Sequence, residues 1–396
     1  MKGRKMRRLV RFLSLVVVLA ALGWLGLWWY AESRLALAVD QAAARLHAAG
    51  WTVSHGAVTR GTSPFVADVR VADLRLTPPV ADGPAPTLEI PAVDLVVHPA
   101  APLTLDLGFA TVWRMALEGG PSFTLRFGSI AADDRFDLAD LLHHAPDPLR
   151  AGAFHATDLR VDSENTNFTL VSIAAIDASG TRNPDAGPDS MAATLHESLR
   201  GLALSPLFVT LGNLPFGGKL TALSVDLALS GPAAALPARL TLPPGARWLA
   251  PGAAANLPAL WRQLGPALHR WAQGGGHGTY DFGLTVGPLD AHGTGSFGFD
   301  AGAQPKGRLH LVADGLGAAL GALSTHYPSL TGDISALTTA AAPYFTRGPK
   351  GGQRLAVDFV LAHGAVSANG TKLTTVPPLV WPASPQAVPG KAAPKG

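Results

Sequence analysis

The densest group of side chains that could carry out chemistry lies in the segment DDRFDLADLLHH. Its polar members are Asp133, Asp134, Asp137, Asp140, His143 and His144. If the segment is helical, Asp140 and His144 are four residues apart on one face and could hold a divalent metal ion. The other interpretation is a short solvated helix, because acids near its beginning and histidines near its end complement the helix dipole. We favour the solvated helix, since the cluster lacks the spacing of a zinc protease or a calcium loop.

The stretch from Gly293 to Gly298 matches the G-x-G-x-x-G pattern of dinucleotide-binding proteins. In those proteins the glycines open a helix whose N–H groups meet the pyrophosphate. Here Phe297 and Phe299 follow in alternation, which is typical of a strand. The stretch therefore predicts a turn and the beginning of a strand rather than a nucleotide site.

A second near match to a phosphate-binding motif is Gly217-Gly218-Lys219-Leu220. The earlier glycine of that motif is replaced by Asn213, and Leu220 lacks the hydroxyl group that would bind magnesium. Nucleotide chemistry is therefore unsupported here as well.

Serine-based hydrolysis has no support in the sequence. No G-x-S-x-G elbow occurs. His196-Glu197 lacks the second histidine of a zinc protease and predicts an exposed polar pair. We therefore expect a protein that is not an enzyme, with no catalytic, cofactor-binding or metal-binding residues. The alternative that stays open is a metal-dependent hydrolase that uses residues 133–144.

The composition excludes several broad classes of protein. Of the 396 residues, 47% are hydrophobic and 15% are charged, and there is no cysteine. These values exclude a disordered chain, a disulfide scaffold and a cysteine-ligated metal site. The 44 glycines and 33 prolines predict many short elements separated by turns.

The net charge of +3 comes from one end of the chain. Residues 1–11 contain six basic residues and no acidic one, which leaves 25 basic against 28 acidic residues in the remainder, a net charge of −3. Nucleic-acid binding needs a basic face that replaces condensed counterions. The remainder has no cluster of basic and aromatic residues, so we expect no nucleic-acid partner.

Residues 12–30, FLSLVVVLAALGWLGLWWY, carry no charge. As a helix they span about 28 Å, close to the hydrocarbon thickness of a bilayer. The aromatic residues of this predicted anchor are Phe12, Trp24, Trp28, Trp29 and Tyr30. Aromatic residues at the end of a span suit the lipid–water interface, and basic residues favour the cytoplasmic side. We therefore expect a single-pass membrane protein with a cytoplasmic N-terminus and an exported body.

The alternative for this segment is a cleaved signal peptide that ends near Ala21-Leu22-Gly23. The apolar run continues beyond that site into bulky aromatic residues, which a signal-peptidase site lacks. An uncleaved anchor is therefore favoured.

Residues 31–50 continue the helical pattern as an amphipathic stalk. Leu35, Val39, Ala42 and Leu46 share one stripe, and Gly50 ends the helix. The stripe either packs on the body or lies on the membrane surface. We favour packing, because the polar face lacks the lysine and arginine richness of interfacial helices.

After residue 51 the hydrophobic period changes from 3.6 to 2, which predicts strands with one apolar face. Alternating apolar residues occur in residues 65–76, 103–109, 123–127, 223–229, 280–286 and 355–361. Most gaps are too short for crossover helices, so antiparallel pairing is expected. The first run changes parity at Ala72-Asp73, which predicts a β-bulge or a strand break.

Two helices are expected among the strands, at residues 256–273 and from Asp314 to Leu323, and both are expected to plug or cap a sheet. In the first, Trp261, Leu264, Leu268 and Trp271 follow helical spacing. Such a stripe favours packing in a core. The alternative is that these four side chains line a groove for an apolar ligand.

The expected fold is mainly β: an N-terminal transmembrane helix and amphipathic stalk, then an elongated, curved, largely antiparallel sheet with a few short helices. The expected organisation is a cytoplasmic segment (1–11), an anchor (12–30), a stalk (31–50), a β-rich periplasmic body (51–380) and a disordered tail (381–396). Subdomain joints are expected near residues 181–190 and 231–255, which are rich in turn-forming residues or in Ala and Pro.

Several segments, in order, resemble a bacterial family known as domain of unknown function 2125. They are the aromatic end of the anchor, AAGWTV at 48–53, Pro64-Phe65 leading into VADVRVADLRL, and the segments at 287–323 and 364–382. The resemblance spans nearly the whole chain and implies no catalytic residues. More distantly, an anchor followed by an elongated antiparallel sheet is similar to the AsmA-type envelope proteins, whose sheets are associated with lipid handling.

These features predict a membrane-anchored periplasmic protein that presents an apolar groove or face to lipid or another apolar ligand in maintenance of the cell envelope. The alternative is a scaffold that docks protein partners, such as other envelope proteins, through exposed sheet edges.

Overall fold

The computed structural model describes residues 26, 28–63, 65–80, 84–98, 100–138, 140, 149–166, 168–236, 257–348 and 353–382. The predicted cytoplasmic segment, most of the predicted anchor and all but two residues of the predicted tail lie outside these ranges. Within the described ranges, no helix is both long enough and apolar enough to cross a membrane.

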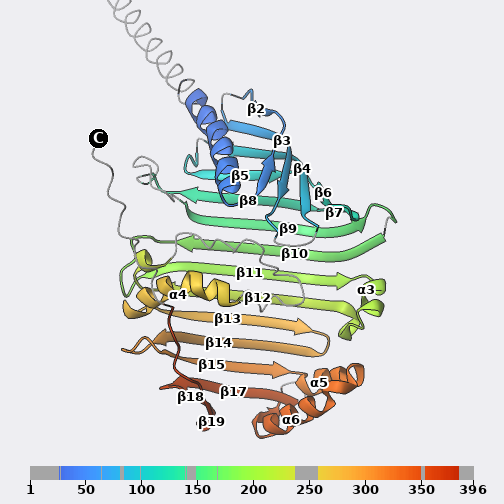
Figure 1. Cartoon of the computed structure of the whole chain (residues 1–396), viewed down its shortest axis with the longest axis vertical. Helices are drawn as coiled ribbons and strands as arrows, with labels where there is room; N and C mark the ends of the chain where they lie inside the picture. The colour runs from blue at the N-terminus through green and yellow to red at the C-terminus, as the bar shows by residue number, and fades with distance from the viewer. Residues whose placement is uncertain are drawn as a thin grey trace, which may run out of the picture. The chain divides into compact units, whose positions relative to one another are not determined.

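The fold is mainly β, as predicted, with antiparallel strands and few helices (Figure 1). The chain divides into two compact units. The first comprises residues 1–180 and 198–219, and the second comprises residues 181–197 and 220–396. The predicted joint at 181–190 lies at the beginning of the second unit, and most of the predicted joint at 231–255 lies outside the described residues.

The first unit contains nine complete strands. They are β1 (Thr52–Ser54), β2 (Val58–Arg60), β3 (Ala67–Thr77), β4 (Pro86–Val97), β5 (Thr104–Phe109), β6 (Val112–Leu117), β7 (Ser122–Arg126), β8 (Ser129–Phe136) and β9 (Leu149–Ser163). Strand β4 pairs with β5 along one half and with β6 along the other. The two branches, β5–β8 and β6–β7, meet again on β9. This branching brings residues that are distant in sequence onto neighbouring strands.

Strands β10 (Phe168–Arg182) and β11 (Met191–Leu204) contribute residues to both units. The first unit ends with helix α3 (Pro206–Leu211) and the 3₁₀ turn η1 (Pro215–Gly218). The side chain of Ser205 caps α3 by accepting a hydrogen bond from the backbone N–H of Phe208.

Residues 28–48, which comprise the end of the predicted anchor and most of the predicted stalk, are helical, and Gly50 follows with a φ of 86°. We refer to residues 28–48 as the N-terminal helix. Val39 packs on a core cluster of Val71, Ile90 and Val93, and Leu35 and Leu46 are half-buried. The helix therefore packs on the body, as predicted, although Ala42 of the predicted stripe is exposed.

The predicted irregularity in β3 lies at Asp73, which adopts a φ of 48°. Val71 and Leu74, on either side, pack into the same hydrophobic cluster. In a regular strand, residues three apart point to opposite faces. The left-handed conformation of Asp73 thus turns the later apolar residues back toward the core.

The N-terminal helix carries a buried carboxylate. Glu32 is 1% exposed, and its Oε1 atom has no hydrogen-bond partner among the described residues. Burial raises the pKa of Glu32, and the nearby negative charge of Asp68 adds to this, whereas Arg60 and the backbone N–H of Asp68 oppose it.

We expect Glu32→Gln to stabilise the protein at neutral pH. Because the pKa of Glu32 is higher in the folded state than in the unfolded state, ionisation of Glu32 lowers the stability of the fold as the pH rises from the unfolded-state pKa through the folded-state pKa. The amide removes this charge, so the free energy of unfolding should rise on the order of 1 kcal/mol near pH 7. Urea denaturation from about pH 4 to about pH 8 measures it. Glu118→Gln, at an exposed position, is the control, and an unchanged profile for Glu32→Gln would contradict the prediction.

The second unit contains eight further strands. They are β12 (Lys219–Ser230), β13 (His277–Val286), β14 (Leu289–Phe299), β15 (Pro305–Asp314), β16 (Phe345–Arg347), β17 (Gln353–Ala362), β18 (Ala365–Ala368) and β19 (Thr371–Thr375). β12 pairs with β13, β13 with β14, and β14 with β15, and β15 then pairs with β17. β16 pairs with β17, β17 with β18, and β18 with β19.

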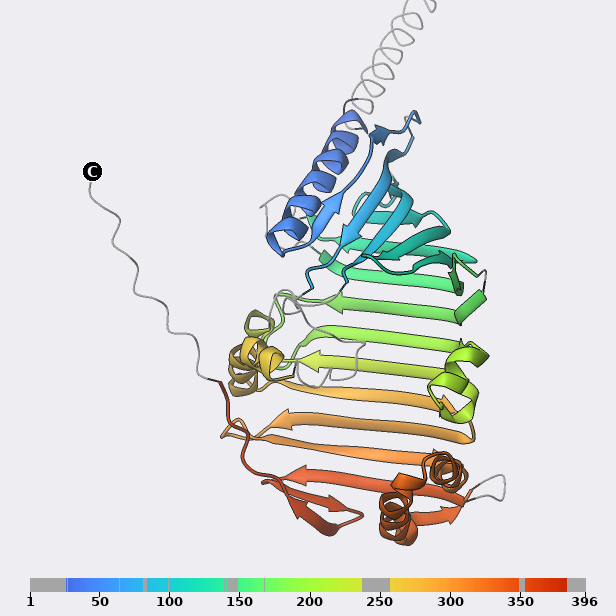
Figure 2. The ribbon, with the colours of Figure 1, turned by 45° about the vertical axis from the view of Figure 1, so that its right-hand side comes forward.

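Both predicted helices are present in the second unit. They are α4 (Leu257–Gln273) and α5 (Leu316–His326), and sequence patterning did not predict a third, α6 (Thr331–Ala341). The 3₁₀ turns are η2 (Ala233–Ala235), η4 (Pro328–Leu330) and η5 (Ala342–Tyr344). Leu316 of α5 and Ala341 of α6 pack on a core of Ala291, Ala313 and Leu355, so these helices cap one end of the sheet, where Figure 2 also places them.

Candidate functional site

The acidic segment that could have held a metal does not form one helix. Asp133 and Asp134 lie in strand β8, paired with β5 on one side and β9 on the other, so the helical interpretation is wrong for them. Ladder hydrogen bonds to two neighbouring strands outweigh a local preference for helix. Burial, then the nearby charge of Asp133, raises the pKa of Asp134.

Among the described residues, the remaining members of that cluster form no metal site. Asp140 forms an ion pair with Arg150, and its backbone N–H donates to Asp137 Oδ1 at 3.2 Å. His143 and His144 lie outside the described residues. Across the described ranges, no group of three or more His, Asp or Glu side chains is arranged to hold a metal ion.

Neither glycine motif forms a phosphate-binding loop. Gly293 to Gly298 lie inside strand β14, as the alternating phenylalanines indicated, although in its interior rather than at its beginning. Gly217 and Gly218 lie in η1 and lead into strand β12 instead of a helix. A helix N-terminus, which would supply the N–H groups for phosphate, is missing in both places.

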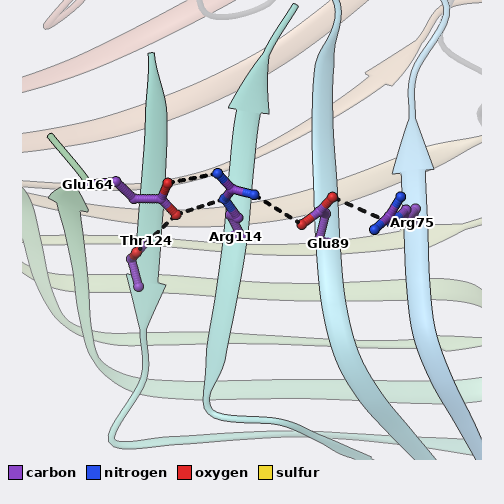
Figure 3. Close-up of polar contacts among 5 residues, drawn as sticks. All are labelled: Arg75, Glu89, Arg114, Thr124 and Glu164. Atoms are coloured by element: carbon purple, nitrogen blue, oxygen red, sulfur yellow. Dashed lines mark hydrogen bonds and ion pairs between the residues drawn. The ribbon is translucent and has the colours of Figure 1, made fainter.

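A row of paired charges crosses the first unit, and we call it the charged row (Figure 3). It consists of Arg75 on β3, Glu89 on β4, Arg114 on β6, Thr124 on β7, and Glu164 directly after β9. Arg114 makes a bidentate contact with Glu164, with Nε–Oε1 and Nη2–Oε2 distances of 2.8 and 3.0 Å. Arg75 Nε lies 3.4 Å from Glu89 Oε1, and Arg114 Nη1 lies 3.9 Å from Glu89 Oε2.

The charged row borders a pocket of about 310 Å³ that is also lined by Ile90, Pro91 and Trp113. The hydrogen bond to Glu164, followed by its charge, raises the pKa of Arg114, so this arginine stays cationic. Each carboxylate in the row contacts an arginine, and Thr124 Oγ1 donates a hydrogen bond to Glu164 Oε1 at 3.4 Å. The ion pairs join β3 to β4, β4 to β6, and β6 to the end of β9.

A second polar cluster in the first unit centres on Asp177 of β10. Its Oδ1 atom lies 2.5 Å from His155 Nδ1, and its Oδ2 atom accepts hydrogen bonds of 3.2 Å from Ser198 and from Arg200. The hydrogen bond with His155 is the largest cause that lowers the pKa of Asp177. These contacts join β9, β10 and β11.

We expect Asp177→Asn to make the decrease of stability with falling pH less steep. Because the folded-state pKa lies below the ordinary value of 3.8, the stabilisation is present above that value and is lost as pH falls through the folded-state pKa. His155→Gln should act in the same direction, since it removes the principal cause of the shift. Thermal unfolding between about pH 2 and about pH 6 measures both variants. An acid transition as steep as that of the unaltered protein would contradict the prediction.

The four side chains of the predicted helical groove lie in α4 but do not share one environment. Trp271 is 1% exposed and packs on Phe297 and Phe299. Trp261 stacks on Trp381, with ring centroids 5.2 Å apart, and its Nε1 donates to the Val380 carbonyl. Leu264 and Leu268 are half-buried. Binding of an apolar ligand by these four residues stays a prediction.

The second unit has an apolar surface on one face of its sheet, and this surface comprises more side chains than the predicted groove on α4. Cross-strand register places Val225, Phe282 and Leu311 in one row, and Leu227, Tyr280, Leu309 and Phe359 in the next. We call these seven residues the apolar band. All seven are half-buried rather than buried. The apolar surroundings raise the pKa of Tyr280 through burial.

Helices cover this face on both sides of the band. Trp271 of α4 packs at Phe297 and Phe299, near one end of β14, and α5 packs near the other end, at Ala291. Figures 1 and 2 show α4 and α5 at opposite ends of the strands. Between them the band is left with partial exposure.

Two glycines of β14 shape the apolar band. A Cβ atom on Gly293 would lie 2.4 Å from the ring of Phe282, and one on Gly295 would lie 2.5 Å from the ring of Tyr280. The rings therefore lie directly over the glycine backbone, which explains the glycine spacing in GTGSFGF. The alternation on β12, β13 and β17 was evident in the sequence, but the contribution of Leu309 and Leu311 was not recognised, and their own alternation is the signal that could have revealed it.

The opposite face of this sheet is polar. His310 Nδ1 lies 2.7 Å from Asp358 Oδ1, and His196 Nδ1 lies 2.6 Å from Asp226 Oδ1. His196, which was predicted to be an exposed polar residue, is thus paired with a carboxylate across strands. The sheet of the second unit has one apolar and one charged face, as alternation with a period of two dictates.

The fold and these surfaces define a mainly β, antiparallel sheet protein with a half-buried apolar face and no recognisable catalytic constellation in the described residues. The model of the family described as "Uncharacterized protein conserved in bacteria (DUF2125)" matches residues 28–377, most of the chain. The chain belongs to this family.

The "Replication factor C large subunit" of Haloquadratum walsbyi is 27% identical over 165 residues, which cover 41% of this chain and 32% of that protein. This partial likeness does not define a family. No solved structure matches the chain.

Proposed function

We propose that the protein is anchored in the bacterial inner membrane by residues 12–30, with its N-terminus in the cytoplasm and its body in the periplasm. In this proposal it is not an enzyme, and the apolar band of the second unit takes up lipid acyl chains or a similar apolar ligand in maintenance of the envelope. The distant similarity to AsmA-type envelope proteins belongs to the same proposal.

The observation that carries the proposal is the half-buried apolar band. Seven large apolar or aromatic side chains on four strands form a surface that is flanked by helices at both ends of the strands. A contiguous, partly exposed apolar surface often marks a binding site for an apolar partner, whereas the solvent-facing side of an ordinary sheet is polar. The band spans several strands, which suits a long acyl chain. The band is also almost free of polar groups, because the only one among the seven side chains is the hydroxyl of Tyr280, which donates to the Arg308 carbonyl at 3.2 Å.

Photocrosslinking in living cells tests lipid binding. p-Benzoylphenylalanine is introduced into the full chain at Phe282 or at Phe359, and the irradiated protein is analysed for lipid adducts by mass spectrometry. Val360 is the matched control, because it follows Phe359 in β17, points to the opposite face and is 41% exposed. We expect lipid adducts at Phe282 and Phe359 and none at Val360. Equal labelling of all three positions, or of none, would contradict the proposal.

The second candidate function is a scaffold that docks protein partners at a sheet edge. Strand β19 favours it, because all five of its residues are exposed and the described residues provide no pairing for its second edge. The same photoreactive group at Leu373, which is 50% exposed, tests this function. A reproducible protein adduct at Leu373, without lipid adducts at Phe282, would favour the scaffold.

A further inference from the structure

Aromatic exposure in the described part of the chain is concentrated at one point of the first unit. The three most exposed aromatic side chains there are Phe65, Trp29 and Tyr30, at 71%, 60% and 51%. Trp29 and Tyr30 lie in the first described turn of the N-terminal helix. Phe65 lies in the loop between β2 and β3, more than thirty residues later in the sequence.

A hydrogen bond holds the loop and the helix together. Trp28 Nε1 donates to the carbonyl of Val66 at 3.0 Å, which fixes the residue beside Phe65 against the turn that carries Trp29 and Tyr30. One turn further along, Glu32 is buried and accepts a hydrogen bond from the backbone N–H of Asp68. Figures 1 and 2 both show this loop beside the beginning of the helix. Folding of the first unit therefore fixes the position of Phe65 next to the first described turn of the helix.

The exposed charged side chains beside this point are arginines, whereas Asp68 is half-buried. Arg34 donates from Nε to the Tyr30 hydroxyl at 2.9 Å, and its guanidinium lies 5.1 Å from the Tyr30 ring centroid. Arg60, at the base of the loop, is exposed, and residues 61–67 carry no charge. The acidic Glu32 is withdrawn from the surface by burial. Exposed aromatic residues with arginines beside them are typical of a surface that meets anionic lipid headgroups.

We propose that Phe65, Trp29 and Tyr30 form a lipid-inserting surface that docks the first unit onto the bilayer. This inference rests on the proposed membrane anchor, because residues 12–30 would bring the surface to the lipid. It adds a second point of contact from the body itself. A helix alone leaves an attached body free to swivel, whereas an inserted Phe65 fixes the face that the first unit turns to the membrane.

Because the chain has no cysteine, single nitroxide labels test the proposal in the full-length protein. Phe65→Cys, Thr62→Cys, Val18→Cys and Glu118→Cys are each labelled and reconstituted in vesicles of phosphatidylethanolamine and phosphatidylglycerol. Electron paramagnetic resonance then compares collisions with oxygen, which concentrates in lipid, and with a water-soluble nickel chelate. Circular dichroism confirms that each labelled variant is folded.

We expect the Phe65 label to favour oxygen, the Thr62 label to lie nearer the headgroups, and the Glu118 label, in the loop between β6 and β7, to favour the nickel chelate. A Val18 label in lipid with a Phe65 label in water would overturn this inference and leave the anchor intact. A Val18 label in water would overturn the anchor itself, and this inference with it. Lipid exposure at both Phe65 and Glu118 would also contradict a contact limited to the loop and the helix.

Discussion

Replacing Trp271 by alanine is expected to lower the free energy of unfolding by about 3–5 kcal/mol. Trp271 is 1% exposed, and its ring centroid lies 5.9 Å from that of Phe299 and 6.3 Å from that of Phe297. The indole also lies directly over Gly276, where a Cβ atom would approach it to 2.3 Å. Truncation therefore leaves a large cavity between α4 and the sheet, which the rigid glycine backbone cannot fill by collapse.

Trp261→Ala is the matched control in the same helix. Trp261 is half-buried and its main ring contact is the stack on Trp381, so a loss of about 0.5–1.5 kcal/mol is expected. Trp271→Phe should cost less than Trp271→Ala, because phenylalanine keeps an aromatic ring in the site and leaves a smaller cavity. Both replacements remove the buried indole N–H, which has no partner in the described residues. Chemical denaturation measures all three. Equal losses for Trp261→Ala and Trp271→Ala would show that Trp271 does not anchor α4.

Gly315→Ala is expected to lower the free energy of unfolding by about 3 kcal/mol. Gly315 precedes α5 with a φ of 71°, a conformation that strains any residue with a Cβ atom. A Cβ atom at this position would also lie 1.9 Å from the Pro288 carbonyl oxygen, so the backbone at the beginning of β14 must move. That movement disturbs the core around Ala291 and Ala313, on which α5 packs.

Gly321→Ala provides a control with the opposite sign. Gly321 lies inside α5, and a Cβ atom there would meet nothing within 4 Å. Alanine should therefore stabilise the helix by about 0.5–1 kcal/mol, because it restricts the unfolded chain and favours the helical backbone. Thermal unfolding of the two variants should move the midpoint in opposite directions. A shift of the same sign for both would contradict the conformational argument.

The two surfaces with functional proposals lie on different units and make separate claims. The apolar band of the second unit concerns what the protein binds, and the surface around Phe65 concerns how the first unit meets the membrane. Each has its own probes, so photocrosslinking at Phe282 and spin labelling at Phe65 can succeed or fail independently. A lipid adduct at Phe282 without insertion of Phe65 would describe a lipid-binding protein attached by its helix alone.

The sequence by itself determined the class of many local elements. A period of two in the apolar residues predicted the strands at 223–229, 280–286 and 355–361, and helical spacing predicted α4 and α5 nearly to their ends. The parity change at Ala72-Asp73 predicted the irregularity that Asp73 forms with its positive φ. These successes have one cause. Periodicity and turn chemistry depend on neighbours within a few residues, which the sequence contains explicitly.

Only the tertiary structure decided which residues meet across strands. Arg114 pairs with Glu164, 50 residues later, and Trp261 contacts Trp381 and Val380, about 119 residues later. Asp133 and Asp134 lie in a strand because β5 and β9 flank β8 with open hydrogen-bonding edges, which no local pattern reveals. Strand register is set by the sum of many weak contacts over the whole sheet, so partners that are distant in sequence become neighbours only when the chain is folded.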